Sequence, residues 1–200
     1  GATRIDQTEP CAVPTLHQLL THTSGLSYGF NPGVLGAEMA AQHIEFRGTK
    51  LTLAQMCDKL AALPLAFAPG SRWEYSVSID VLGRVIEVVT GKTLEQFFIE
   101  EIFDPLGMHE TRFIVPEHAK DRFSACYTPQ AGDAFSVGKV DSGADTLRPL
   151  DGSDKSPFLR DQIQSGGGGL VGTIDDYLGF PAMMRTGGAG LIGPRRRDAV

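Results

Sequence analysis

The strongest structural signal in the chain is the apolar pattern from Ile79 to Gly91. Apolar residues recur there at intervals of three and four, which is typical of an α-helix. They are Ile79, Leu82, Val85, Ile86 and Val89, with Val81 and Val88 on the flanks. An apolar surface this wide predicts a helix buried on most sides. The stretch before it ends in Tyr75 and Ser76, so a tyrosine and a serine are expected where this helix begins.

Capping and breaking signals predict about four further helices, and no run of strong strand alternation is present. The expected helix starts are Pro14, Thr52, Thr93 (in a capping box with Gln96) and Thr173 (spaced to Asp176), and the expected stops are Gly25, Pro64, Gly91 and Gly107. This pattern predicts a mainly α fold. We expect a helical core over 14–112, an irregular surface excursion over 113–164, and a glycine-rich loop with a helix over 165–186.

Composition narrows the function classes. The net charge of -6 and the single basic run at Arg195–Arg197 argue against a nucleic-acid partner. No stretch has the length of a membrane span, and no apolar leader is present, so we expect a soluble protein, with the cytoplasm favoured. Three widely spaced cysteines indicate neither a disulfide framework nor a metal motif. His17 and His22 are five residues apart and do not share a helix face. No metal and no cofactor are expected.

Five sequence blocks, in order, resemble the middle of the serine β-lactamase-like superfamily, which includes class C β-lactamases, DD-peptidases and family VIII carboxylesterases. The blocks are Leu19-Leu-Thr-His-Thr-Ser-Gly-Leu26, Phe67-Ala-Pro-Gly-Ser71 with Tyr75-Ser76, Asp80 to Gly91, Pro105-Leu-Gly-Met108, and Ser165-Gly-Gly-Gly-Gly-Leu170 with Asp175-Asp-Tyr177. Any one of them is a weak signal, but five in the family's order are hard to produce by chance. The resemblance implies one partial β-lactamase-like domain over residues 1–200: the helical subdomain of an α+β fold, with most of the antiparallel sheet missing from this chain.

The resemblance also implies nucleophilic catalysis by three motifs, of which only the second, a Tyr-Ser-x, is visible here. Tyr75 would be the general base that takes the proton of a serine nucleophile. A phenol titrates near pH 10, so it serves as a base only where neighbouring cations favour its charged form. The Ser-x-x-Lys that carries the nucleophile is expected upstream of Gly1, so the chain alone is expected to be inactive.

The substrate expectation rests on two features. Val77 stands where the β-lactamase form has asparagine, and valine cannot hydrogen-bond a substrate amide, so the site leans toward small-molecule carboxylic esters. Ser76 and the glycines are assigned to substrate binding by resemblance, because absent side chains let backbone approach a ligand. These glycines are Gly166, Gly167 and Gly168.

Other interpretations stay open. Tyr75 can be a half-buried aromatic at a helix start, and Ser76 or Ser78 can be that helix's N-cap. Ser136 and Lys139 satisfy Ser-x-x-Lys in spacing, but nearby glycines do not favour a buried helix, and the order is reversed. We interpret His22 as a hydrogen-bonded structural residue.

Two other function classes also remain. The chain can be a non-catalytic helical module that self-associates or binds a partner or complementary fragment, or it can belong to a β-lactamase or DD-peptidase.

Overall fold

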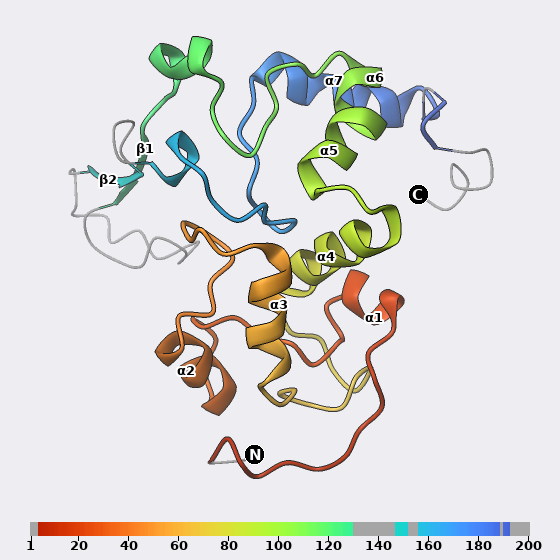
Figure 1. The fold of residues 1–200 in the computed structure, drawn as a ribbon, viewed down its shortest axis with the longest axis vertical. Helices are drawn as coiled ribbons and strands as arrows, with labels where there is room; N and C mark the ends of the chain where they lie inside the picture. The colour runs from red at the N-terminus through yellow and green to blue at the C-terminus, as the bar shows by residue number, and fades with distance from the viewer. Residues whose placement is uncertain (1–3, 130–146, 152–155, 189, 193–200) are drawn as a thin grey trace.

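The structure is a computed structural model that describes residues 4–129, 147–151, 156–188 and 190–192. Helices dominate this part of the chain (Figure 1). The α-helices are α1 (Leu16–Leu20), α2 (Val34–Ala41), α3 (Leu53–Ala61), α4 (Ser78–Thr90), α5 (Leu94–Phe98), α6 (Asp104–Leu106) and α7 (Ile174–Arg185). A π-helical turn, η1 (Ile99–Phe103), joins α5 to α6, and the 3-10 helices η2 (Glu117–Arg122) and η3 (Pro157–Leu159) lie in the longer connections.

Local capping explains where several helices begin and end. Thr52 and Thr93 are N-caps in full capping boxes with Gln55 and Gln96, and Thr173 accepts a hydrogen bond from the Asp176 amide. Gly91 ends α4 in the left-handed conformation. These predicted boundaries are confirmed.

Other local predictions were wrong. Helix α1 begins at Leu16 with Thr15 as its N-cap, not at Pro14, because Thr15 and Gln18 form a capping box that the prediction did not use. It ends at Leu20, before Gly25. Helix α2 was not predicted, because its N-cap is Gly33 and no side chain caps it.

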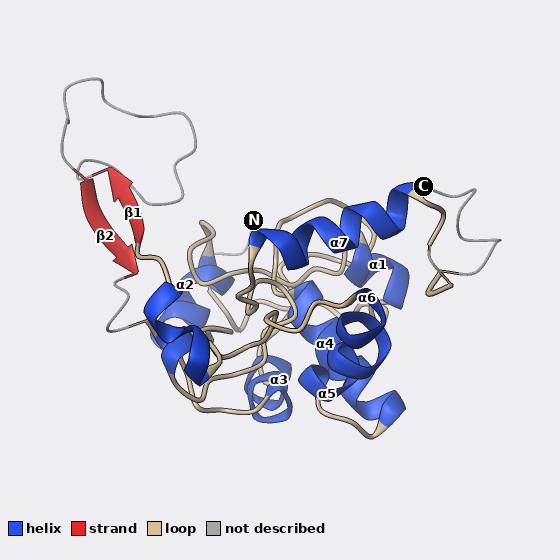
Figure 2. Ribbon diagram, turned by 90° about the horizontal axis from the view of Figure 1, so that it is seen from above, coloured by secondary structure: helices blue, strands red, loops and turns tan. Residues whose placement is uncertain are grey.

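A single two-stranded antiparallel sheet is present in the described residues. It pairs β1 (Cys126–Pro129) with β2 (Leu147–Asp151). Figure 2 shows this hairpin extending to one side of the helical body. The division of the chain at residues 112 and 164 stays a prediction.

The hydrophobic core lies between α2, α3, the start of α4 and α5. Its buried members are Leu35, Met39, Ile44, Phe46, Leu53, Met56, Leu60, Val77, Leu94, Phe113 and Ile163. Helix α4 contacts α1, α3 and α5 and so occupies the centre of the described helices (Figure 1). The residues just before α4 are thereby fixed to the core.

The prediction that α4 is buried on most sides was wrong. Its buried residues are Ser78, Asp80 and Gly83, on one face of its first half. Val88 and Val89, near its end, are 65% and 78% exposed. The helix is apolar on a face that no described residue covers.

The described residues include no helix with both the length and the apolar character needed to cross a membrane.

Candidate active site around Tyr75

Tyr75 lies in the loop before α4, with its side chain 48% exposed. Its ring contacts two others: the ring centroids of His22 and Tyr28 are each 5.1 Å from that of Tyr75. Trp73 lies edge-on to His22 at 6.2 Å, and Phe30 stacks on Tyr28 at 4.7 Å. Trp73 and Phe30 are exposed. Tyr75 is therefore the centre of an aromatic surface that is open to solvent.

The backbone around Tyr75 is held by polar contacts from the 22–31 segment. The Asn31 side-chain amide donates to the Tyr75 carbonyl oxygen at 2.8 Å. The neighbouring Glu74 carboxylate accepts from the Ser27 hydroxyl at 2.7 Å and pairs with Arg72 at 2.9 Å. Because two chain segments are tied together on both sides of the tyrosine, its phenol has a defined direction.

Tyr28 presents a neutral phenol to Tyr75. Burial raises the pKa of Tyr28 well above its ordinary value, and the negative charge of Asp80 and a hydrogen bond with Tyr75 add to the rise. Tyr28 therefore keeps its proton at neutral pH and is available as a hydrogen-bond donor beside Tyr75.

Ser76 and Ser78 are not helix caps. The N-cap of α4 is Val77, and no side chain caps the helix. Both serine hydroxyls instead belong to a buried chain of hydrogen bonds: Ser76 to Ser78 at 2.7 Å, and Ser78 to Ser24 at 2.7 Å. The Ser76 hydroxyl also lies 3.2 Å from Nδ1 of His22. Ser76 is 1% exposed, and its assignment to substrate binding stays a prediction.

Val77 is fully buried in the core. Its side chain packs against the helices and does not line the surface beside Tyr75. The residue type at this position is therefore set by packing, and the preference for esters that was inferred from it needs other support.

The glycine-rich loop packs on the first turn of α4. A Cβ on Gly166 would lie 2.6 Å from the Ile79 carbonyl oxygen, and one on Gly167 would lie 2.9 Å from a carboxylate oxygen of Asp80. A Cβ on Gly168 would meet nothing within 4 Å. Close packing thus explains two of the three glycines assigned to substrate, and Gly168 alone faces open space. All three assignments stay predictions.

Asp80 holds this loop in place. Its carboxylate oxygen Oδ1 accepts hydrogen bonds from the Ser165 hydroxyl and from the Gly167 amide, the latter at 3.2 Å. Burial raises the pKa of Asp80, and these two hydrogen bonds partly oppose the rise. Sequence reasoning missed Asp80 as an anchor because its partners are 85 and 87 residues away.

This burial makes a prediction about stability and pH. Because the pKa of Asp80 is higher in the folded chain, the native state binds its proton more tightly, and this stabilisation is complete below the unfolded pKa of about 3.9. It is lost as the pH rises through the folded pKa. Asp80→Asn keeps the Oδ1 acceptor without the charge, so the variant should gain stability relative to wild type over that window, by at most about 1.4 kcal/mol per pH unit.

Urea unfolding of both proteins between pH 4 and pH 7.5 measures the difference. Asp80→Ala, which loses the acceptor, is the control and should lose stability at every pH. Parallel pH profiles for wild type and Asp80→Asn would show that the pKa of Asp80 is not raised.

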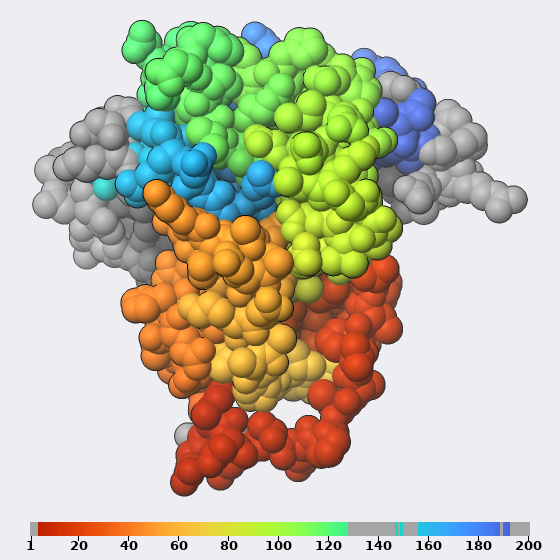
Figure 3. All heavy atoms as spheres, in the orientation of Figure 1, coloured from red at the N-terminus to blue at the C-terminus, as the bar shows by residue number. Residues whose placement is uncertain are grey.

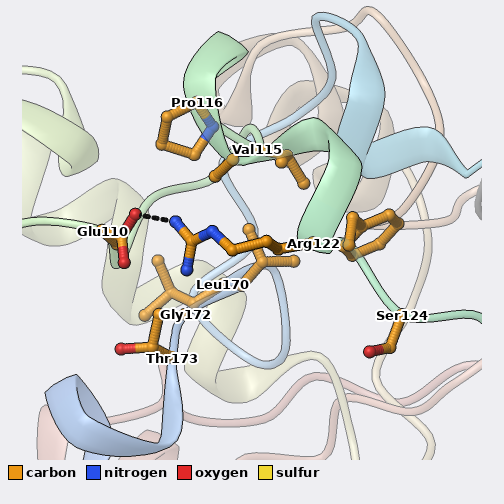
Figure 4. A pocket seen from close by; sticks show the side chains of 11 residues that line it. Glu110, Val115, Pro116, Arg122, Ser124, Leu170, Gly172 and Thr173 are labelled. Atoms are coloured by element: carbon orange, nitrogen blue, oxygen red, sulfur yellow. Dashed lines mark hydrogen bonds and ion pairs between the residues drawn. The ribbon is translucent and has the colours of Figure 1, made fainter.

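Two cavities lie away from Tyr75. One, of about 400 Å³, is lined by the 110–124 and 170–173 segments, and Figure 4 shows Arg122 crossing it to pair with Glu110. The hydrogen bond from Arg122 lowers the pKa of Glu110, with a smaller contribution from His118. The other, of about 760 Å³, lies beneath the N-terminal segment, which arches over the helical body in Figure 3. Tyr75 lines neither cavity.

The remaining candidates are placed as follows. Ser136 and Lys139 lie outside the described residues. Over the ranges that the structure describes, no group of three or more His, Cys, Asp or Glu side chains could hold a metal ion. Cys11, Cys57 and Cys126 are free thiols.

Comparison with known proteins identifies the setting of this site. The family model described as Beta-lactamase matches residues 11–198. The chain is 34% identical over 182 residues to esterase EstB of Burkholderia gladioli, covering 86% of this chain and 44% of that protein. It is 39% identical over 106 residues to the lovastatin esterase of Penicillium rubens, covering 52% of this chain and 26% of that protein.

Solved structures give the same picture. EstCE1, a hydrolase with promiscuous acyltransferase activity, matches with a TM-score of 0.71 and 31% identity over 91% of this chain and 48% of its own. A mutant of simvastatin synthase from Aspergillus terreus matches with a TM-score of 0.69 and 27% identity over 92% of this chain and 39% of its own. The chain therefore spans less than half the length of each of these four proteins.

Proposed function

Because the chain belongs to the β-lactamase family of serine hydrolases and acyltransferases, we propose that it forms part of an esterase in which Tyr75 is the general base. The observation that carries the proposal is the position of Tyr75: its phenol is half exposed, while both neighbouring residues are tied to the 22–31 segment. A base needs access to its substrate and a fixed direction.

The proposed reaction has two steps. Tyr75 takes the proton of a serine hydroxyl as the serine oxygen attacks the ester carbonyl, and the alcohol leaves with a proton to give an acyl-serine. Water or a second alcohol then attacks the acyl-serine, and the serine regains its proton. The names of EstB and of the lovastatin esterase support ester substrates, and the acyltransferase activity in the name of EstCE1 supports an alcohol as the second acceptor.

The nucleophile is proposed to lie outside the described residues and to differ from Ser136. The sequence contains one Ser-x-x-Lys match, Ser136 with Lys139, and Gly138 and Gly143 do not favour the helix that the motif needs. In this proposal the chain is the helical subdomain of a β-lactamase-like α+β fold, whose sheet comes mostly from sequence beyond these 200 residues. A β-lactam or peptide substrate is the alternative within the same family.

The test compares the 200-residue chain with the same chain joined to the flanking segments of EstB. We expect the chain alone to leave p-nitrophenyl butyrate unhydrolysed and Ser136 unlabelled by a fluorophosphonate, and the joined protein to turn the ester over. Labelling of Ser136, found by peptide mapping, would identify a self-contained hydrolase and contradict the proposed nucleophile.

A second candidate, a module that binds a complementary segment, is favoured by a specific observation. Apolar side chains are exposed on three helices and next to them: Val13, Leu16, Leu20, Val88, Val89, Ile174, Tyr177 and Leu178. Large exposed apolar areas mark contact surfaces. Size-exclusion chromatography of the chain alone should then show self-association, which the EstB flanking segments should remove. A monodisperse monomer would argue against this candidate.

A further inference from the structure

His22 has a backbone conformation that few residues other than glycine adopt. Its φ is 54°, and among the described residues only His43 is a second non-glycine residue with positive φ. Such a conformation is strained and persists only where surrounding contacts enforce it. The contacts that do so at His22 all lead to Tyr75.

His22 holds both sequence neighbours of Tyr75. Its carbonyl oxygen accepts the Glu74 amide at 2.9 Å, and its ring nitrogen Nδ1 accepts the Ser76 amide at 3.3 Å. The Ser76 hydroxyl lies 3.2 Å from the same nitrogen, and the imidazole ring is in contact with the Tyr75 ring. One residue thus fixes the backbone before Tyr75, the backbone after it, and one face of its side chain.

The contact with the Ser76 amide also determines the form of the imidazole. An amide N–H can only donate, so Nδ1 must be unprotonated, and the neutral ring carries its proton on Nε2. Burial lowers the pKa of His22, which agrees with a neutral ring. Protonation would direct an N–H at the Ser76 N–H. The titratable or charged groups near this ring are Tyr75, the Arg72–Glu74 pair, and Tyr28 with Asp80 beyond Tyr75.

We propose that His22 is a positioning residue for Tyr75, which it holds through Glu74 and Ser76 by means of a neutral imidazole with Nδ1 as acceptor. The proposal rests on the role of Tyr75 proposed above, and it adds a residue that acts only through the base. Protonation of His22 should release Ser76 and disorder Tyr75, so activity should have an acid limb that belongs to His22.

The first experiment needs no variant and no catalysis. Nitrogen-15 NMR of the 200-residue chain reports the protonation of each ring nitrogen, and a pH titration follows the Ser76 amide and the Tyr75 ring. We expect an unprotonated Nδ1 at pH 7, and Ser76 and Tyr75 resonances that shift together with the titration of His22. A protonated Nδ1 at pH 7, or Ser76 and Tyr75 resonances that ignore this titration, would overturn the proposal.

The second experiment separates positioning from general structural damage. His22→Asn supplies an acceptor oxygen near the place of Nδ1 and tolerates positive φ, whereas His22→Ala supplies no acceptor. In the protein joined to the EstB segments, His22→Ala should lower kcat by about 10- to 100-fold with little change in KM. His22→Asn should retain most of kcat and should lose the acid limb of the pH profile.

His43 provides the matched control, because it is also a histidine at positive φ, 51°, but is exposed and away from Tyr75. His43→Ala should leave kcat and the acid limb unchanged. Equal losses for His22→Ala and His43→Ala, or an unchanged acid limb in His22→Asn, would overturn the positioning role. If the NMR results hold while Tyr75→Phe keeps full turnover, His22 still holds Tyr75, and the proposed function is the part that fails.

Discussion

Replacing Tyr75 with phenylalanine is expected to lower kcat for p-nitrophenyl butyrate by about 10²- to 10⁴-fold in the protein joined to its flanking segments. This corresponds to about 2.7–5.5 kcal/mol of lost transition-state stabilisation. The change removes one oxygen atom, the proposed proton acceptor, and leaves the ring contacts with His22 and Tyr28. KM should change little, because the aromatic surface that faces the substrate remains.

The stability of this variant is the first control. The Tyr75 side chain is half exposed, and its backbone contacts do not involve the phenol, so the urea midpoint of Tyr75→Phe should stay close to that of wild type. Tyr127→Phe, on the hairpin that extends from the body in Figure 2, is the matched control and should keep full activity. If Tyr75→Phe retains turnover within about threefold of wild type, another group accepts the serine proton, because loss of a general base costs far more.

Replacing Gly25 with alanine is expected to cost about 2–5 kcal/mol of unfolding free energy. Gly25 has a φ of 87°, and a Cβ there would lie 2.4 Å from the Phe67 carbonyl oxygen. The left-handed backbone costs an alanine roughly 1–2 kcal/mol, and forcing apart two packed segments adds roughly 1–3 kcal/mol. The neighbouring hydrogen bond, from the Ala66 amide to the Gly25 carbonyl at 2.7 Å, ties these segments together.

Gly91→Ala is the matched control for this prediction. Gly91 is also left-handed, with a φ of 70°, but a Cβ there meets nothing within 4 Å. Its cost should therefore be the backbone term alone, about 1–2 kcal/mol. Urea unfolding with an unchanged m-value compares the two. Equal losses would show that Gly25 and Phe67 do not pack closely in solution.

Features whose physical cause is local could be predicted from the sequence. The starts of α3, α5 and α7 were predicted because an N-cap side chain bonds an amide three residues away, a spacing visible in the chain. The stop at Gly91 was predicted because glycine adopts the left-handed cap without strain. The family was also evident, since five short blocks keep their order and it is supported by the match over residues 11–198.

Only the tertiary structure decided what the residues beside Tyr75 do. The caps expected at Ser76 and Ser78 were wrong because their hydroxyls bond His22 and Ser24, which are 54 residues away. Gly166 and Gly167 pack against α4 across an even longer separation. Local spacing carries no information about such pairs, because the three-dimensional fold brings them together. The sequence by itself thus determined the helix boundaries, the family and the candidate base, and the fold decided which side chains hold that base in place.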